Sequence, residues 1–268
     1  MQQTDAVFSG SIAEMYDRYL GALLFEPYAE DLAERLRDHD GSAVLETAAG
    51  TGIVTRALAR ALKTASIVAS DLNPGMIERA AAASNAPNVR WEQVDAGALP
   101  FGDRTFGLVV CQFGVMFFPE KVAAFREAAR VLAPGGRFAF NVWDDLGANP
   151  VPRVVHETVA AAFPQDPPQF IARTPHGFAD TAAIATWLRD AGFHDITVDA
   201  VEKRSRAASA RAIAIGFVQG TPVRSEIEER DAGRLAELTD AVEAALIERF
   251  GNGAVDATMR ANVFIVRT

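Results

Sequence analysis

A short apolar run that ends in two closely spaced glycines constrains this chain more than any other stretch. Val44 and Leu45 lead to an acid, Glu46, and the small residues of Thr47–Gly52 then precede a segment with helical periodicity. This order predicts a buried strand, a tight turn and the N-terminus of a helix. In α/β proteins such a turn holds a nucleotide-like ligand, because glycines let the backbone approach it and the helix offers unpaired N–H groups.

The alternation of strand and helix continues along the chain. We expect strands over 43–47, 66–70, 89–94, 106–111, 137–142, 196–201 and 257–266. Helical patterns lie between them, over 53–62, from Asn73-Pro74 onward, and over 120–132, 181–191 (capped by Thr181), 209–217 and 225–250. The first five strands are apolar enough to be buried on both faces. The predicted fold class is therefore α/β: a Rossmann-like doubly wound sheet of seven strands, parallel except the last, with helices on both faces.

Two stretches interrupt this rhythm. A helical pattern over 12–36 precedes the first strand, and Pro27 divides it into two helices. Between Asp144 and Asp180 the chain carries six prolines and one short helical pattern, which predicts a lid insertion after strand five. We expect an N-terminal helical cap over 1–40, a cofactor-binding core over 41–143, a lid or substrate insertion over 144–180, and the rest of the α/β core over 181–268, with an inserted helix at 225–250.

The composition excludes several classes of protein. The 268 residues include 26 Lys and Arg against 35 Asp and Glu, and this net charge of −9 gives no basic field for nucleic acid. The one cysteine, Cys111, excludes a disulfide framework and a cysteine metal cluster, and we expect it in the core. No run approaches the roughly 20 apolar residues of a membrane-spanning helix. We expect a cytoplasmic protein that is a monomer or homodimer.

Three acids favour ligand binding at the glycine turn, because each one stands at the end of a predicted strand. Glu46 ends the first strand, where a carboxylate suits a cationic ammonium group. Asp71 ends the second strand, placed for two ribose hydroxyls, and Asp95-Ala96 follows the third, placed for an adenine amino group. Glycines at such a turn also serve helix–strand packing alone, so these acids carry the interpretation.

These segments resemble the class I S-adenosylmethionine-dependent methyltransferases, and within them the small-molecule group that includes the ubiquinone and menaquinone biosynthesis C-methyltransferases. The matching segments, in the order and spacing of the family, are Val44–Gly52, Ala69–Met76, Val94–Phe101, Phe106–Phe118 and Val131–Phe140. The resemblance implies S-adenosyl-L-methionine as the cofactor and methyl transfer as the reaction.

The resemblance also implies which residues bind this cofactor. Around its methionine part and the glycine turn they are Glu46, Ala48, Gly50, Gly52, Gln112, Phe113 and Gly114. Asp71 would bind the ribose, Leu72 and Met76 would pack on the adenine, and Asp95 and Ala96 would bind the adenine edge. Tyr16 and Tyr19 resemble tyrosines that fold over the cofactor in some members, although helix packing explains these two residues equally well.

Two other functions stay open on the residues alone. An acid after the second strand also suits the ribose of a nicotinamide cofactor, but Thr55 replaces the third glycine of G-x-G-x-x-G, which disfavours an NAD-dependent oxidoreductase. The other is a protein that binds S-adenosylmethionine without catalysis, as a sensor or assembly subunit. All three acids at the strand ends, Glu46, Asp71 and Asp95, are present, and this argues against a site that has lost its catalytic function.

The methyl acceptor is expected beyond the fourth strand. Met116, Phe117 and Phe118 leave that strand where the methyl group should emerge, and Trp143 follows the fifth strand. Together they predict an apolar pocket for a flat or lipid-like acceptor, with core packing as the alternative for each residue.

The catalytic residue stays unknown. In-line displacement from a sulfonium depends on alignment, and it needs a general base only when the nucleophile starts protonated. His156 in the predicted lid and Asp144 after the fifth strand are the candidates, and each is also typical of an ordinary loop or surface residue. No motif suggests a metal ion, and we predict none.

Overall fold

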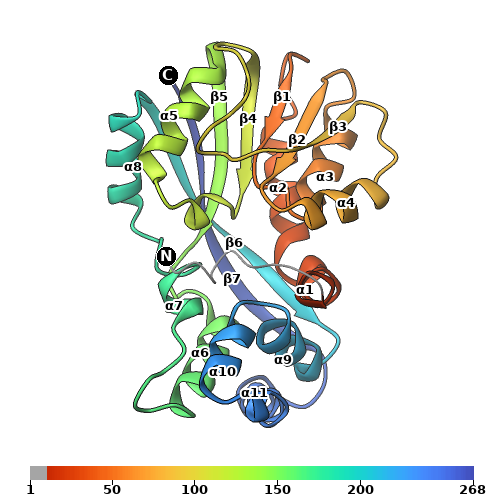
Figure 1. Ribbon diagram of the computed structural model, residues 1–268, viewed down its shortest axis with the longest axis vertical. Helices are drawn as coiled ribbons and strands as arrows, with labels where there is room; N and C mark the ends of the chain where they lie inside the picture. The colour runs from red at the N-terminus through yellow and green to blue at the C-terminus, as the bar shows by residue number, and fades with distance from the viewer. Residues whose placement is uncertain (1–10) are drawn as a thin grey trace. The chain divides into compact units, whose positions relative to one another are not determined.

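The computed structural model describes residues 11–268, so residues 1–10 of the predicted cap lie outside the described residues (Figure 1). The chain divides into two compact units. The sheet unit comprises Tyr28–Val142, Ala179–Val201 and Ala261–Thr268; the helical unit comprises the chain up to Pro27, Trp143–Phe178 and Glu202–Arg260. Three strands contribute residues to both units.

Seven strands form one sheet in the order β3-β2-β1-β4-β5-β7-β6. They are β1 Val44–Glu46, β2 Ile67–Asp71, β3 Val89–Gln93, β4 Phe106–Gln112, β5 Leu132–Trp143, β6 Asp195–Ala207 and β7 Val255–Arg267. β1 pairs in parallel with β2 and with β4, and the pairs β2–β3 and β4–β5 are also parallel. The carboxyl ends of the first five strands therefore meet at one edge, the edge where α/β sheets bind ligands.

The last strand, β7, runs in the opposite direction to β5. Phe264 of β7 stacks on Phe140 of β5 with ring centroids 4.7 Å apart. Four residues before Phe264, the carbonyl of Arg260 accepts the N–H of Asp144, four residues after Phe140. The residue numbers fall along β7 as they rise along β5, which is an antiparallel pairing. The predicted Rossmann-like sheet of seven strands, parallel except the last, is confirmed.

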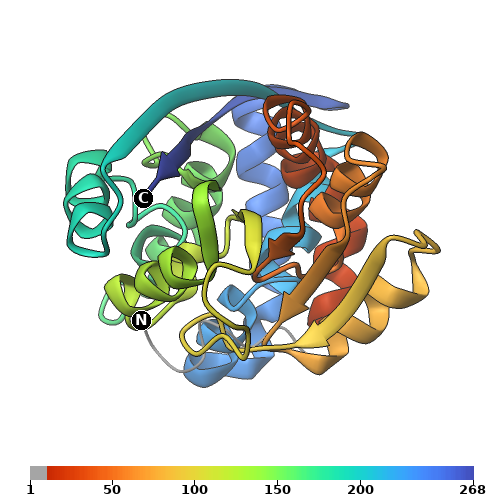
Figure 2. The same cartoon turned by 90° about the horizontal axis from the view of Figure 1, so that it is seen from above.

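Helices cover both faces of the sheet, because successive residues of a strand point to opposite sides. The helices of this unit are α2 Glu26–Arg35, α3 Ile53–Ala61, α4 Pro74–Ala82, α5 Lys121–Val131 and α8 Thr181–Asp190. Ala139 packs into a core formed with α2 and α3, whereas its neighbours Phe138 and Phe140 lie 6.0 and 5.6 Å from the ring of Phe125 in α5. Figure 2 shows α5 and α8 on the side of the sheet opposite to α3 and α4.

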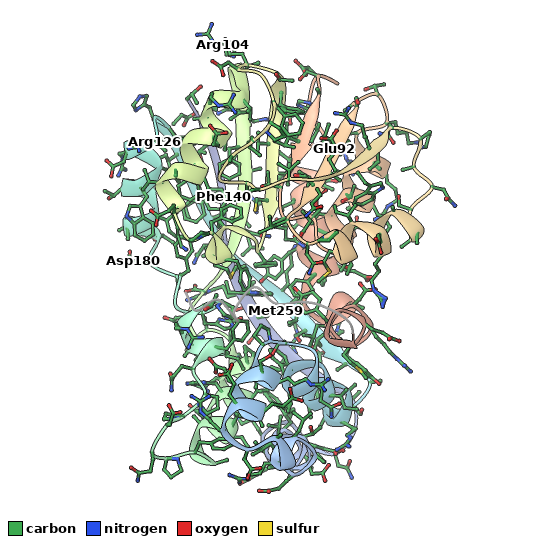
Figure 3. All side chains as sticks on the ribbon, viewed as in Figure 1. Glu92, Arg104, Arg126, Phe140, Asp180 and Met259 are labelled. Atoms are coloured by element: carbon green, nitrogen blue, oxygen red, sulfur yellow. The ribbon has the colours of Figure 1, made fainter. Side chains whose placement is uncertain are left out.

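Side-chain caps decide where two of these helices begin. α4 begins at Pro74 as predicted, and Asn73 caps it, since its Oδ1 accepts the N–H of Gly75. The predicted cap at Thr181 is wrong. Asp180, at the start of α8 in Figure 3, accepts the N–H groups of Ala182 and Ala183 at 3.0 Å each. Its carboxylate satisfies two of the unpaired donors of the first turn.

Two strands differ from their predictions. β3 was predicted to be buried on both faces, but its residues are only partly buried or exposed, because it is an edge strand with one neighbour. β5 begins at Leu132, five residues before the predicted start at 137, and includes the Pro134–Gly136 segment. The pairing with β4 is irregular there, with a register shift between Phe106 and Leu108.

The helical unit contains α1 Ser11–Leu20, the π-helical turn Gly21–Phe25, α6 Pro150–Ala161, α7 Phe170–Arg173, α9 Ala210–Gln219, α10 Val223–Asp231, the 3-10 turn Ala232–Arg234 and α11 Leu235–Phe250. The predicted break near Pro27 is a π turn rather than a gap, because Pro27 has no N–H for the carbonyl four residues earlier. Leu238, Val242 and Leu246 bury one face of α11.

The predicted single helix over 225–250 is wrong, since α10 and α11 are separate helices. The side chain of Asp231 accepts the N–H of Gly233 at 3.0 Å and so competes with the helical hydrogen bonds at that point. None of the helices in the described part of the chain is long and apolar enough to cross a membrane.

Candidate functional site

The turn between β1 and α3 has a backbone conformation that few residues adopt. Ala48, Gly50 and Gly52 have φ angles of +52°, +55° and +77°. A Cβ atom on Gly50 would meet no described protein atom within 4 Å, so this glycine has an open side. A Cβ atom on Gly52 would lie 2.7 Å from Cη2 of Trp91, so packing against β3 requires this glycine. Only Gly50 therefore offers the ligand access predicted for both glycines.

Glu46, the last residue of β1, is a buried acid with one carboxylate oxygen that accepts no hydrogen bond from the described residues. It is 1% exposed, and its Oε2 has no hydrogen-bond partner among the described residues. Burial, together with the nearby carboxylate of Asp71, raises the pKa of Glu46 to about 8. A buried carboxylate is costly unless a cation or several donors compensate it. The geometry therefore favours a cationic group of a ligand at this position.

Asp71 ties the glycine turn to the end of β2, a role that the sequence pattern did not show. Its Oδ2 accepts the N–H of Gly50 and its Oδ1 accepts the N–H of Asn73, each at 2.8 Å. Burial raises the pKa of Asp71, and these backbone donors oppose that effect. A carboxylate has about four acceptor positions. Two ribose hydroxyls could therefore bind in addition, and that role stays a prediction.

The residues predicted for the adenine lie at the same sheet edge. Leu72 is 61% exposed, whereas Met76 of α4 is buried. The N–H of Val94 donates to the carbonyl of Asp71 at 3.0 Å, which places Asp95 and Ala96 beside the end of β2. The structure thus brings these residues to the edge where Glu46 lies, and their contacts with adenine stay predictions.

The turn after β4 packs against the glycine turn. A Cβ atom on Gly114 would lie 2.5 Å from Cβ of Ala48, so the two turns touch. Phe113 has a left-handed φ of +52°, and its ring meets that of Tyr28 edge-on at 5.4 Å. The structure therefore unites the predicted residues Gln112–Gly114 with the glycine turn.

The residues predicted for the acceptor differ in burial. Met116 is 3% exposed and belongs to the core, which is the alternative given for it above. Phe117 and Phe118 are half-buried, and Lys121 fixes their turn by donating to the carbonyl of Phe118 at 2.6 Å.

Tyr16, Tyr19 and Trp143 belong to the helical unit. Tyr16 stacks on Phe25 with ring centroids 5.0 Å apart, and Phe25 lies 6.2 Å from Trp143. Gly216 of α9 lies so close to Tyr19 that an added Cβ atom would be 2.9 Å from the tyrosine Cβ. These contacts are helix packing, and roles of the three residues toward a ligand stay predictions.

The two candidate bases have different surroundings. Asp144 pairs with Arg260, whose Nε lies 2.6 Å from its Oδ2, and its carbonyl accepts the Nδ1–H of His176 at 2.7 Å. Burial lowers the pKa of His176 to about 4, so this histidine is neutral near pH 7. Burial also lowers the pKa of His156, which is half-buried. Asp144 therefore has a structural role in joining β5 to β7, whereas burial disfavours the charged form of His156.

Comparison with known proteins agrees with this arrangement. A family model described as a methyltransferase domain matches residues 44–136. The ubiquinone/menaquinone biosynthesis C-methyltransferase UbiE of Roseobacter denitrificans is 28% identical over 212 residues, 72% of this chain and 83% of that protein. The UbiE of Ectopseudomonas mendocina is 31% identical over 172 residues, 59% of this chain and 67% of that protein. The chain belongs to the class I S-adenosylmethionine-dependent methyltransferases. This methyltransferase is an enzyme whose cofactor is S-adenosylmethionine.

A solved structure shares the fold of this methyltransferase. It is the phosphoethanolamine N-methyltransferase 2 of Haemonchus contortus in complex with phosphomonomethylethanolamine and S-adenosylhomocysteine, with a TM-score of 0.60 and 15% identity. The alignment covers 96% of this chain and 57% of that one. At this identity the likeness shows the fold alone.

The described residues fit the cofactor. The unpartnered Oε2 of Glu46 suits the ammonium group of the methionine part, and the open side of Gly50 allows close approach to the backbone. Sequence reasoning missed the contact of Asp71 with Gly50 and the buried Asn141 behind the turn after β4. The one available signal for Asn141 was an amide side chain inside the apolar run Phe138–Val142.

Proposed function

We propose that this methyltransferase transfers the methyl group to a small apolar or aromatic molecule by in-line displacement. The observation that carries the proposal is the character of the chain that leaves β4. Between Gln112 and Glu120 it has no charged residue, and it places two half-buried phenylalanines, Phe117 and Phe118, after the turn that touches the glycine turn. Such a surface suits a flat or lipid-like acceptor.

The cofactor would be held by the strand-end residues. Glu46 would face its ammonium group, Asp71 its ribose hydroxyls, and Leu72 with Met76 the adenine ring. Asp95 and Ala96 would bind the adenine edge. When bound, the cofactor supplies an electrophilic methyl group on a sulfonium. The contribution of the protein is then alignment and the exclusion of water, both of which the packed strand ends favour.

A base is needed only for an acceptor that starts protonated. Of the two candidates, we propose His156, because its burial favours the neutral imidazole that accepts a proton, whereas Asp144 already pairs with Arg260. The relatives support a small acceptor, since their names assign them to ubiquinone and menaquinone biosynthesis. The net charge of −9 disfavours a nucleic acid in that place.

The test is a transfer assay with methyl-labelled S-adenosylmethionine and four acceptors: an alkylated hydroquinone, ethanolamine phosphate, bulk transfer RNA and a mixed protein substrate. We expect label only in the organic extract of the hydroquinone reaction. Label only in RNA, protein or the amine would overturn the proposal. Heat of binding for S-adenosylhomocysteine without label in any acceptor would favour the sensor function over this one.

A further inference from the structure

Asn141 is a polar residue in a fully buried, apolar part of the sheet. It lies in β5 between Phe140 and Val142, and all three residues are 0% exposed. Burying an amide costs free energy unless its donor and acceptor atoms are satisfied, so an aliphatic residue would serve the core better. The contacts of Asn141 therefore indicate what the amide is for.

Both polar atoms of this side chain are directed at the end of the neighbouring strand. Gln112 of β4 is the register partner of Asn141. Oδ1 of Asn141 accepts the N–H of Phe113 at 3.0 Å, and Nδ2 donates to Oε1 of Gln112 in a longer contact of 3.4 Å. The backbone carbonyl of Asn141 also accepts the N–H of Phe113, at 3.1 Å. Asn141 of β5 thus holds the beginning of the turn after β4, since the single N–H of Phe113 is shared between its Oδ1 and its carbonyl oxygen, and its Nδ2 donates to Gln112.

The turn needs such support because its backbone is strained. Phe113 has a φ of +52°, which costs a residue with a side chain on the order of 1 kcal/mol or more. In this conformation Gly114 comes so close to the glycine turn that a Cβ atom would lie 2.5 Å from that of Ala48. A relaxed Phe113 would carry Gly114 away from Ala48.

We infer that Asn141 is a positioning residue of the cofactor site, which holds Gln112–Gly114 in the left-handed turn that packs against Ala48. It acts through Phe113 and Gln112. The inference rests on the proposed contact of that turn with the methionine part of the cofactor. It predicts that removal of the amide of Asn141 weakens cofactor binding by more than the accompanying loss of stability explains.

The experiment measures the Kd of S-adenosylhomocysteine by calorimetry and the thermal midpoint for four full-length proteins. They are the wild type, Asn141→Leu, Asn141→Asp and a control, Asn149→Leu. Asn149 is a matched control because it is 1% exposed and its Oδ1 also accepts a backbone N–H, that of Arg260 at 2.9 Å in the helical unit. We expect Asn141→Leu to weaken binding about five- to tenfold, as the loss of one or two hydrogen bonds predicts. Asn149→Leu should lower the thermal midpoint and change the Kd less than about twofold.

Asn141→Asp separates positioning from packing, because it keeps an acceptor for the N–H of Phe113. Its affinity should lie closer to the wild type than that of Asn141→Leu. Equal losses for Leu and Asp, or a loss for Asn141→Leu no greater than for the control at the same thermal midpoint, would overturn the inference. If Asn141→Leu does not fold, Asn141→Ser replaces it, since a serine hydroxyl is too short to reach Phe113. Absence of binding by the wild type would instead refute the proposed cofactor contacts themselves.

Discussion

The predicted site residues of the two units differ in how far the protein itself satisfies their polar groups. In the sheet unit, Glu46 is buried with Oε2 unpartnered among the described residues, and Gly50 has an open side. In the helical unit, Asp144 pairs with Arg260 and accepts a hydrogen bond from His176. In the first set a ligand would supply the missing partner of Oε2 of Glu46. In the second set the protein itself supplies the partners. Substitutions should therefore affect binding in the first set and stability in the second.

The largest effect is expected for Glu46→Gln. The neutral amide cannot compensate an ammonium group, so the affinity for S-adenosylhomocysteine should fall by roughly 2–4 kcal/mol. At pH values above 8 and without ligand, the free energy of unfolding of this variant should exceed that of the wild type, because the variant has no buried charge. Calorimetry and thermal denaturation measure the two quantities.

The matched control for Glu46→Gln is Glu226→Gln. Glu226 is also buried, but its carboxylate accepts the N–H groups of Gln169 and Phe170 and pairs with Arg173. This variant should lose stability and keep its affinity. The comparison between the units fails if Glu226→Gln weakens binding as much as Glu46→Gln does, or if Glu46→Gln leaves the Kd unchanged.

Asp71→Asn should have the next largest effect. The amide oxygen can replace only part of the acceptor capacity that now holds Gly50 and Asn73, and it would bind ribose hydroxyls more weakly. We expect a loss of affinity of roughly 1–3 kcal/mol together with a lower thermal midpoint. An unchanged Kd in calorimetry would contradict the ribose role and leave Asp71 as a purely structural residue.

The pH dependence of binding tests the same carboxyl group without a substitution. The pKa of Glu46 in the fold is about 8, above its usual 4.5, so the folded state binds the proton more tightly than the unfolded chain does. The stability of the ligand-free protein should therefore fall as the pH rises from about 4.5 to about 8. Binding of a cation needs the ionised form, so affinity should rise by up to about tenfold per pH unit toward pH 8. In Glu46→Gln both pH dependences should disappear, as titration calorimetry at pH 6, 7 and 8 would show.

The smallest effect is expected for Asp144→Asn. Its ion pair with Arg260 is partly open to solvent, so the unfolding free energy should fall by less than about 1 kcal/mol. The Kd of the cofactor product and kcat should both stay near the wild-type values. A fall in kcat of a hundredfold or more at unchanged Kd would show that Asp144, rather than His156, is the base.

Local sequence patterns determined many of the strands, turns and helices of this protein. The run Val44–Glu46 and the glycines after it predicted the first strand, turn and helix, since burial and left-handed backbone are properties of single residues and their neighbours. The same holds for Asn73, which caps α4 one residue before a proline. The predicted strand ends also placed Glu46, Asp71 and Asp95 at one edge of the sheet, because the carboxyl ends of parallel strands lie at the same edge.

Only the tertiary structure decided which of these groups are already engaged. Asp71 reaches Gly50 across 21 positions, Asn141 reaches Phe113 across 28, and Asp144 reaches Arg260 across 116. Such contacts depend on strand order and on the antiparallel direction of β7, neither of which leaves a periodic signal in the sequence. The sequence therefore determined which residues stand at the sheet edge. Packing decided that Oε2 of Glu46 has no hydrogen-bond partner among the described residues, whereas Asp144 pairs with Arg260.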